Sequence, residues 1–241
     1  MLSTPTRKPR LILADDHAML RDGLRSILNE QGFDVVGEAA DGHEAVRLSE
    51  TLIPDIAVLD ISMPILNGID AARLILKCCP HTKILILTMY TQDRYVLAAL
   101  RAGISGFVLK SKAASQLVVA IDSMLKGEIY LDPSIARVVA EAYLAKDETP
   151  SDPLSMRERE VLQLIAEGKN AKEIGGILGV SPKTAESHRA NIMQKLHLSE
   201  VAGLVRYAIR EGLVQESTEI SVDPGQRSAT ESALRFSAKV I

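Results

Sequence analysis

Five polar residues in the first 110 positions are of the types needed for phosphoryl-transfer chemistry: Asp15, Asp16, Asp60, Thr88 and Lys110. Crowded carboxylates repel one another unless a cation lies among them, and an all-oxygen ligand set suits Mg²⁺. With the metal screening its charge, the Asp60 carboxylate could attack a phosphoryl group and form an acyl phosphate. The Thr88 hydroxyl and the Lys110 ammonium would then donate to the phosphoryl oxygens.

These residues stand at the ends of short apolar runs that are typical of buried strands. The runs span residues 10–15, 34–39, 55–60, 83–88 and 106–110. Between them lie segments with helical spacing, such as 18–30 and 94–102. This alternation predicts an α/β fold with a parallel sheet covered on both faces, in which all strand carboxyl ends lie on one edge. We therefore expect the five polar residues to meet at that edge.

Each of these residues also has an ordinary structural explanation. Asp15 and Asp60 could be helix N-caps that follow strands, and threonine is common in strands. It is their joint appearance at successive strand ends that favours a shared site.

Composition and charge are consistent with two domains. The chain has 241 residues and a net charge of −3. No run approaches the roughly 20 apolar residues that cross a bilayer, and the first ten residues lack the apolar core of a signal peptide, so we expect a cytoplasmic protein without membrane contact.

The two cysteines, Cys78 and Cys79, are adjacent, and we interpret them as buried or inert thiols. Residues 154–213 carry nine Lys and Arg against seven Asp and Glu, a net of +2 that does not by itself indicate DNA binding.

The last third of the chain contains four short helical patterns. They span residues 154–167, 171–178, 181–196 and 200–211. The second and third patterns, joined by a glycine-containing turn, predict a helix-turn-helix within a DNA-binding domain of residues 154–214. Residues 127–153 before it predict a linker with a helix that begins at Asp132-Pro133, and the polar residues 215–241 predict a disordered tail.

The outward face of the third helix has the residue types of a DNA-reading surface. Ala185, His188, Ile192 and Leu196 form its core stripe. The candidate DNA contacts are Lys183, Thr184, Glu186, Ser187, Arg189, Ala190, Asn191, Gln194 and Lys195. Small residues let a helix enter the major groove, amides can read adenine, and basic residues anchor phosphates. A plain solvated helix face is the alternative.

Several motifs resemble a known family. ADDH (14–17), VLDISMP (58–64), LTMY (87–90) and GFVLK (106–110) are similar to the receiver domain of bacterial two-component response regulators, over residues 10–126. Residues 154–214 resemble the LuxR-type helix-turn-helix of NarL/FixJ regulators. The resemblance implies a flavodoxin-like receiver with a five-stranded sheet of order 2-1-3-4-5, followed by an all-α domain of four helices.

The resemblance also implies roles for individual residues. Asp60 would be the phosphoacceptor, and Asp15, Asp16, Asp60 and the Ser62 carbonyl would bind Mg²⁺. Thr88, Phe107 and Lys110 would be the switch residues. The implied partners are a sensor histidine kinase, promoter DNA and a second copy of the chain on DNA, with RNA polymerase as a further candidate. The protein would regulate transcription and would not be an enzyme beyond its own phosphorylation and dephosphorylation.

The sequence departs from the family pattern at several positions. Ser111 follows Lys110 where many receivers have a proline with a cis bond, and Phe107 stands where tyrosine is common. Ala171 and Gly175-Gly176 depart from the usual pattern near the first helix of the helix-turn-helix.

Two other functional classes compete with this interpretation. A haloacid-dehalogenase-like phosphatase also forms an aspartyl phosphate, but it needs a general acid two positions after the nucleophile, where Ser62 stands. A DNA-binding or interaction protein that works without phosphorylation would fit the same sequence.

Overall fold

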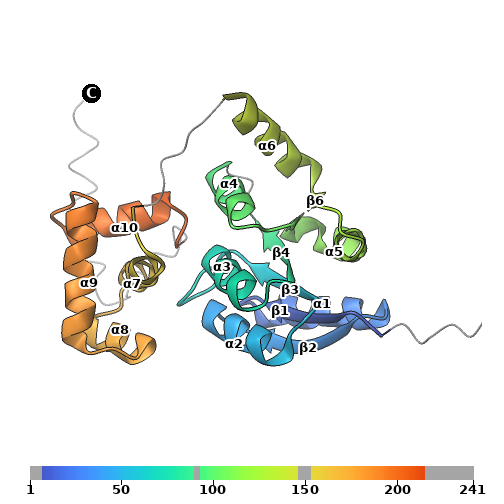
Figure 1. Ribbon diagram of the computed structural model, residues 1–241, viewed down its shortest axis with the longest axis horizontal. Helices are drawn as coiled ribbons and strands as arrows, with labels where there is room; N and C mark the ends of the chain where they lie inside the picture. Colours follow the sequence, from blue (N-terminus) through green and yellow to red (C-terminus); the bar gives the residue numbers. More distant parts are fainter. Residues whose placement is uncertain (1–6, 90–92, 146–152, 215–241) are drawn as a thin grey trace, which may run out of the picture.

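The computed structural model describes residues 7–89, 93–145 and 153–214 (Figure 1). The predictions for residues 146–152 of the linker, for the tail and for Tyr90 of the LTMY motif lie outside these residues. Within them, no helix is long and apolar enough to cross a membrane.

The first part of the chain forms one parallel sheet with the strand order β2-β1-β3-β4-β5-β6. The strands are β1 (Arg10–Ala14), β2 (Asp34–Ala39), β3 (Ile56–Asp60), β4 (Lys83–Thr88), β5 (Gly106–Leu109) and β6 (Tyr130–Leu131). The predicted order 2-1-3-4-5 is confirmed, but the predicted number of five strands is wrong. The additional β6 pairs with β5 through Gly106 and Tyr130 and through Phe107 and Leu131. Two residues are too few to show a strand pattern in the sequence.

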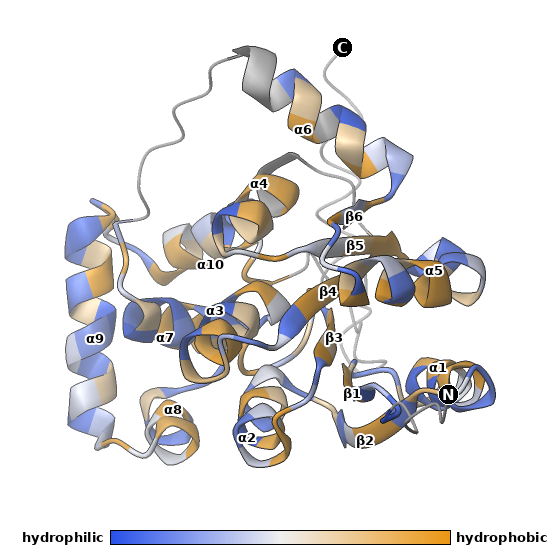
Figure 2. Cartoon of the chain, turned by 45° about the vertical axis from the view of Figure 1, so that its right-hand side comes forward, coloured by the Kyte–Doolittle hydropathy of each residue, from blue (hydrophilic) through white to orange (hydrophobic). Residues whose placement is uncertain are grey.

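Helices cover both faces of the sheet. They are α1 (Ala18–Glu30), α2 (Gly42–Leu52), α3 (Gly68–Cys78), α4 (Asp93–Arg101), α5 (Ala113–Leu125) and α6 (Pro133–Ala145). Side chains from α1 and α5 pack on one face, and those from α2, α3, α4 and α6 pack on the other. Successive strand residues point to opposite faces, so Ile12 joins one core and Leu13 the other. The strands between the helices, such as β3 and β5, are largely apolar (Figure 2).

The expected linker helix begins where the sequence predicted. Asp132 Oδ1 accepts a hydrogen bond from the Ser134 backbone N–H (3.0 Å), and Pro133 is the first residue of α6. Ile135 is fully buried against the receiver core, and α6 lies beside α4 (Figure 1). The helix is therefore packed on the sheet layer and does not stand free between the domains.

The second part of the chain is all-α, as predicted. Its helices are α7 (Met156–Ala166), α8 (Ala171–Leu178), α9 (Pro182–Lys195) and α10 (Val201–Arg210). Ser155 and Asn170 form capping boxes with Glu158 and Glu173, and Ser181 caps α9 by accepting from the Thr184 backbone N–H (3.1 Å). Apolar side chains from all four helices form one core, which includes Val161, Ile174, Ile192 and Leu204.

The two cysteines lie at the C-terminal end of α3, with their Sγ atoms 3.6 Å apart. Cys79 is buried, and its thiol contacts the Ser49 carbonyl (3.4 Å), whereas Cys78 is exposed. Partial burial of the Cys78 sulfur and the neighbouring Cys79 thiol raise the pKa of Cys78 to about 11. At neutral pH, Cys78 is therefore a protonated and unreactive thiol in spite of its exposure.

We expect Cys78 in the folded protein to react with iodoacetamide at pH 8 at least about tenfold more slowly than a free thiol of ordinary pKa, because so little thiolate is present. The measurement is alkylation followed by mass spectrometry across pH, with the urea-unfolded protein as control. The rate should keep rising toward pH 11. A plateau below pH 9 would contradict the raised pKa.

Candidate functional site

Three carboxylates gather at the carboxyl ends of β1 and β3. Asp15 and Asp60 are 2% and 3% exposed, and Asp16 lies beside them at the surface. One ligand atom from each of Asp15, Asp16, His17 and Asp60 lies within 4.8 Å of the others. The structure thus brings together the acidic residues that the strand-end pattern selected.

Lys110 joins two of these carboxylates. Its Nζ lies 2.8 Å from Asp15 Oδ2 and 2.8 Å from Asp60 Oδ2. Burial alone would lower the pKa of Lys110, but the charges of Asp60 and Asp15 and the hydrogen bonds to them outweigh it and raise that pKa. Lys110 therefore stays protonated. Every peptide bond among the described residues is trans, which includes the bond from Lys110 to Ser111.

Burial also acts on Asp60 itself. It raises the pKa of the Asp60 carboxyl, as does the charge of Asp15, while the Lys110 ammonium and a hydrogen bond from the Ser62 backbone oppose the rise. The fold thus disfavours the ionised form of this carboxyl, and additional positive charge beside it would stabilise that form.

The other predicted switch residues come from the neighbouring strands. Thr88, at the end of β4, is buried, and β4 pairs directly with β3. Phe107 in β5 is fully buried in the core on the α3–α4 face. Ser62 lies two residues after Asp60, in the segment from residue 61 to 67 that we call the β3–α3 loop. The four strand ends and this loop therefore surround one edge of the sheet.

Two residues that sequence reasoning missed shape this loop. Asn67 caps α3, and its side chain accepts from the backbone N–H groups of Ile69 (3.1 Å) and Asp70 (3.0 Å). Gly68 follows it, and a Cβ on Gly68 would lie 2.0 Å from the Asp60 backbone oxygen. The Asn-Gly pair before a helical pattern is a turn signal that could have identified both residues.

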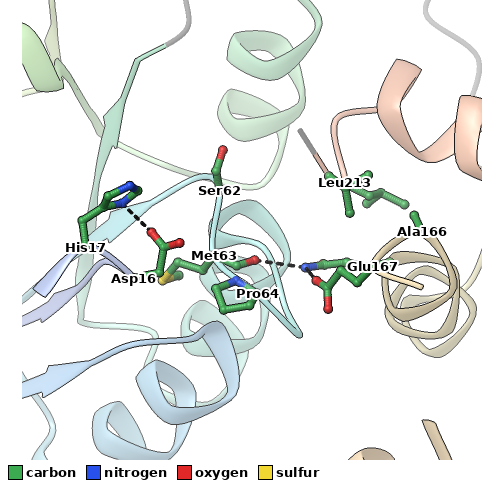
Figure 3. A pocket seen from close by; sticks show the side chains of 10 residues that line it. Asp16, His17, Ser62, Met63, Pro64, Ala166, Glu167 and Leu213 are labelled. Atoms are coloured by element: carbon green, nitrogen blue, oxygen red, sulfur yellow. Dashed lines mark hydrogen bonds and ion pairs between the residues drawn. The ribbon is translucent and has the colours of Figure 1, made fainter. Parts of the chain in front are cut away.

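The acidic edge opens into a cavity of about 300 Å³ between the two domains (Figure 3). Asp16, His17, Ser62, Met63 and Pro64 line it from the receiver side, and Gln163, Ala166, Glu167, Leu213 and Val214 line it from the helical domain. His17 Nδ1 lies 2.7 Å from Asp16 Oδ1 at its rim. Nothing in the local sequence pattern pointed to Gln163 or Glu167.

The predicted DNA-reading face of α9 is open to solvent. The exposed residues on it are Lys183, Thr184, Glu186, Ser187, Ala190, Asn191, Gln194 and Lys195. Ala185 and Ile192 are buried beneath them, whereas His188 and Leu196 are only partly buried. The face of α9 is therefore available to a large partner while the two domains are in contact.

Two of the basic residues on α9 are already paired within the domain. Arg189 lies 2.7 Å from the Glu186 carboxylate, and Lys195 Nζ lies 2.7 Å from Glu158 Oε2. Burial would raise the pKa of Glu158, but hydrogen bonds from Lys195 and Ser155 outweigh it and lower that pKa. Lys195 therefore helps to hold α9 on α7 in addition to any contact it makes with DNA.

Comparisons with known proteins agree with this arrangement. Residues 11–122 match the response regulator receiver domain, and residues 152–208 match the luxR family of bacterial regulatory proteins. The oxygen regulatory protein NreC of Staphylococcus carnosus is 40% identical over 214 residues, which cover 85% of this chain and 99% of that protein.

Solved structures of the response regulator RcsB are similar as well. RcsB from Salmonella typhimurium has a TM-score of 0.53 and 30% identity, covering 84% of this chain and 98% of that one. A structure of two RcsB dimers bound to two parallel DNAs has a TM-score of 0.52 and 31% identity, covering 83% and 98%. Together with the receiver sheet and the helix-turn-helix, these matches establish that the chain belongs to the family of DNA-binding two-component response regulators with a LuxR-type domain.

Proposed function

We propose that Asp60 accepts a phosphoryl group and that this modification controls transcription through α9. The observation that carries the proposal is the Lys110 ammonium held 2.8 Å from both Asp15 and Asp60 at the edge of the sheet. We assign residues 10–126 to the receiver, 127–153 to a linker and 154–214 to the DNA-binding domain.

The residues at this edge fit a Mg²⁺ ion. Asp15, Asp16 and Asp60 bring three negative charges against the single positive charge of Lys110, and the buried Asp60 carboxylate gains from further positive charge. Asp16 lies toward solvent, where a metal could keep several of its waters. Asp15, Asp16, Asp60 and the Ser62 carbonyl would hold the ion. When bound, it would screen the charge between the carboxylate and the incoming phosphoryl group.

The chain's own side chains account for the transfer step. An Asp60 carboxylate oxygen forms a bond to phosphorus while the bond from phosphorus to the donor's imidazole nitrogen breaks, and the imidazole keeps that electron pair. Lys110 and Thr88 donate to the phosphoryl oxygens in the product. Phe107, at the neighbouring β5, would repack as Thr88 moves. The donor class is a phosphohistidine of a sensor kinase, for which acetyl phosphate can substitute.

The output of the protein is DNA binding by the exposed face of α9. The similarity to RcsB, which has been solved as dimers on DNA, supports a homodimer of this chain on promoter DNA. RNA polymerase would be a further partner at the promoter.

Radiolabelled acetyl phosphate tests the proposed function. We expect the purified chain to take up label with Mg²⁺, to lose that ability with a chelator, and to bind a promoter fragment identified by genomic footprinting more tightly after labelling. Failure of the wild-type chain to take up label would contradict the proposal.

For the DNA contact, we expect Lys183→Ala to weaken binding to all sequences alike and to reduce the slope of log affinity against log salt by about one unit. Lys183 is exposed on α9 and has no ion-pair partner among the described residues, so its charge is available to a phosphate. Titrations of promoter and random duplexes at several salt concentrations measure the slope. Lys77→Ala, at an exposed position of α3, is the control. A sequence-selective loss with an unchanged slope would contradict the phosphate role.

A further inference from the structure

Two adjacent thiols meet beside a small cavity at the C-terminal end of α3. Cys78 is the last residue of α3, Cys79 follows it, and their Sγ atoms are 3.6 Å apart. Both residues line a cavity of about 260 Å³, so a small molecule that enters it can reach both sulfur atoms. The other residues that line the cavity are Glu50, Ile53, Pro80, His81 and Thr82. We call Cys78 and Cys79 the cysteine pair.

Backbone carbonyls hold the two thiols in place. The Cys78 thiol donates to the Ile75 carbonyl (3.4 Å), and the Cys79 thiol donates to the Ser49 carbonyl (3.4 Å). Each carbonyl also accepts from a backbone N–H group, that of Cys79 (2.7 Å) at Ile75 and that of Ile53 (2.9 Å) at Ser49. The thiols can therefore lose their protons without leaving either carbonyl unsatisfied.

The segment that follows the cysteine pair is anchored to the sheet. The buried Thr82 hydroxyl donates to the Pro54 carbonyl (2.8 Å), just before β3 and β4 begin. The helices that border the cavity, α2 and α3, lie side by side (Figure 1). Asp60 is at the opposite end of β3, so an inference about the cysteine pair does not rest on the proposed role of Asp60.

The backbone does not favour a disulfide between the two cysteines. The Cα atoms of adjacent residues joined by a trans peptide bond are about 3.8 Å apart, whereas those of disulfide-bonded cysteines are usually about 4.4–6.8 Å apart. The bond from Cys78 to Cys79 is trans. A disulfide here would thus require the backbone to move.

The surroundings do not suit a metal cation such as Zn²⁺ either, because zinc sites in proteins take three or four protein ligands. Within the described part of the chain, ligand atoms of three or more His, Cys, Asp or Glu residues come together only at the Asp15 cluster. The cysteine pair therefore has no third ligand close by. The raised pKa of Cys78 also means that a cation would have to displace a firmly held proton at neutral pH.

The separation of the two sulfur atoms suits a single bridging atom that needs only two ligands from the protein. If that atom were bonded to both sulfurs at about 2.3 Å, the length of a zinc–thiolate bond, a separation of 3.6 Å would give an angle of about 103° at it. An angle just below the tetrahedral value is typical of a pyramidal atom with three bonds and a lone pair. Trivalent arsenic is such an atom and prefers sulfur to oxygen. Its third substituent would lie in the cavity.

We propose that the cysteine pair is a binding site for trivalent arsenicals. An arsenical with two hydroxyl groups condenses with the pair: two S–H and two As–O bonds break, two As–S bonds form, and each hydroxyl leaves with a thiol proton as water. Arsenic stays trivalent, and nothing is oxidised or reduced. Because the hydroxyl groups take up the thiol protons, the protonated state that slows alkylation of Cys78 does not oppose this reaction.

Phenylarsine oxide, which is a dihydroxide when hydrated, is the probe for the reduced full-length chain. We expect native mass spectrometry to show one phenylarsenic group per chain, and a thiol titration to show the loss of both thiols. The competing dithiol 2,3-dimercaptopropanol should remove the group from the folded chain only at a concentration at least about tenfold higher than from the same chain unfolded in urea. The reason is that the fold holds the two sulfur atoms in position in advance.

Cys78→Ser and Cys79→Ser are the matched variants, because each keeps a single thiol. Both should lose the arsenical to the monothiol 2-mercaptoethanol at a concentration that leaves wild type loaded, and circular dichroism checks that they are folded. Single variants that retain the arsenical as firmly as wild type would contradict binding by the pair.

Two results on wild type alone would also overturn the proposal, so the test does not depend on the folding of a variant. If the folded and unfolded chains resist the competing dithiol equally, the two neighbouring cysteines bind by their sequence alone and the fold provides no site. If Zn²⁺ displaces the arsenical at equal concentration, the cysteine pair belongs to a metal centre instead.

Discussion

Asp60→Asn is expected to abolish covalent labelling by acetyl phosphate and leave the protein folded. The substitution removes one nucleophilic oxygen and preserves the shape of the side chain. Burial and the charge of Asp15 raise the pKa of Asp60, which means that the fold disfavours the ionised form of this carboxyl. The neutral amide avoids this cost, so the free energy of unfolding at neutral pH should be no lower than that of wild type.

The measurement is incorporation of radiolabel per chain, together with urea unfolding. Asp55→Asn is a matched control, because Asp55 lies just before β3, at the end of the strand opposite Asp60, where its carboxylate accepts from the Arg10 backbone N–H (2.7 Å). This control should take up label like wild type. Undiminished labelling of Asp60→Asn would rule out Asp60 as the phosphoacceptor.

Gly68→Ala is expected to have the next largest effect. A Cβ at this position would lie 2.0 Å from the Asp60 backbone oxygen and 2.8 Å from its carbonyl carbon, and backbone atoms cannot turn aside as a flexible side chain can. The end of β3 must therefore shift and displace the phosphoacceptor. We expect labelling to fall at least about a hundredfold, since small misplacements of reacting groups cost that much. The free energy of unfolding should decrease by about 1–3 kcal/mol.

Gly23→Ala is the matched control, because it makes the same substitution at a position where the added Cβ meets no other atom. Gly23 is exposed in α1, and nothing lies within 4 Å of a Cβ built there. The free energy of unfolding of this control should rise by about 0.5–1 kcal/mol, because alanine is the better helix former. Its labelling should be unchanged. Equal labelling by the Gly68 and Gly23 variants would show that the close approach at Gly68 does not position Asp60.

The sequence predicted the acidic edge because each of its residues carries a local signal. A strand is visible as an apolar run, and the topology of a parallel sheet then brings Asp15, Asp60 and Lys110 together without any knowledge of their contacts. The apolar runs alone were enough to predict where β1, β3 and β4 end. By contrast, β6 has only two residues. The alternation of a strand repeats every two residues, so it cannot be recognised in so short a segment.

The contacts between the domains left no such signal. Gln163 and Met63 are 100 positions apart, and Gln163 and Asn67 are 96 apart. The sequence pattern around a helical glutamine does not show whether its side chain is exposed or is buried by another domain. The pairing of Lys195 with Glu158 was missed for the same reason, since each residue alone is typical of a solvated helix face.

The short β6 has a consequence for how this protein can associate with others. A sheet edge with free backbone groups attracts further strands, which leads to uncontrolled aggregation. Here β6 ends at Leu131 after only two residues. The next residue, Asp132, is fully buried, and its carboxylate is paired with Lys112 (2.8 Å). Hydrogen bonds from Lys112 and Ser134 outweigh burial and lower the pKa of Asp132, so its carboxylate stays ionised and keeps this ion pair at the end of the strand. This edge therefore offers a foreign strand only two strand residues to pair with, which disfavours association by strand addition here.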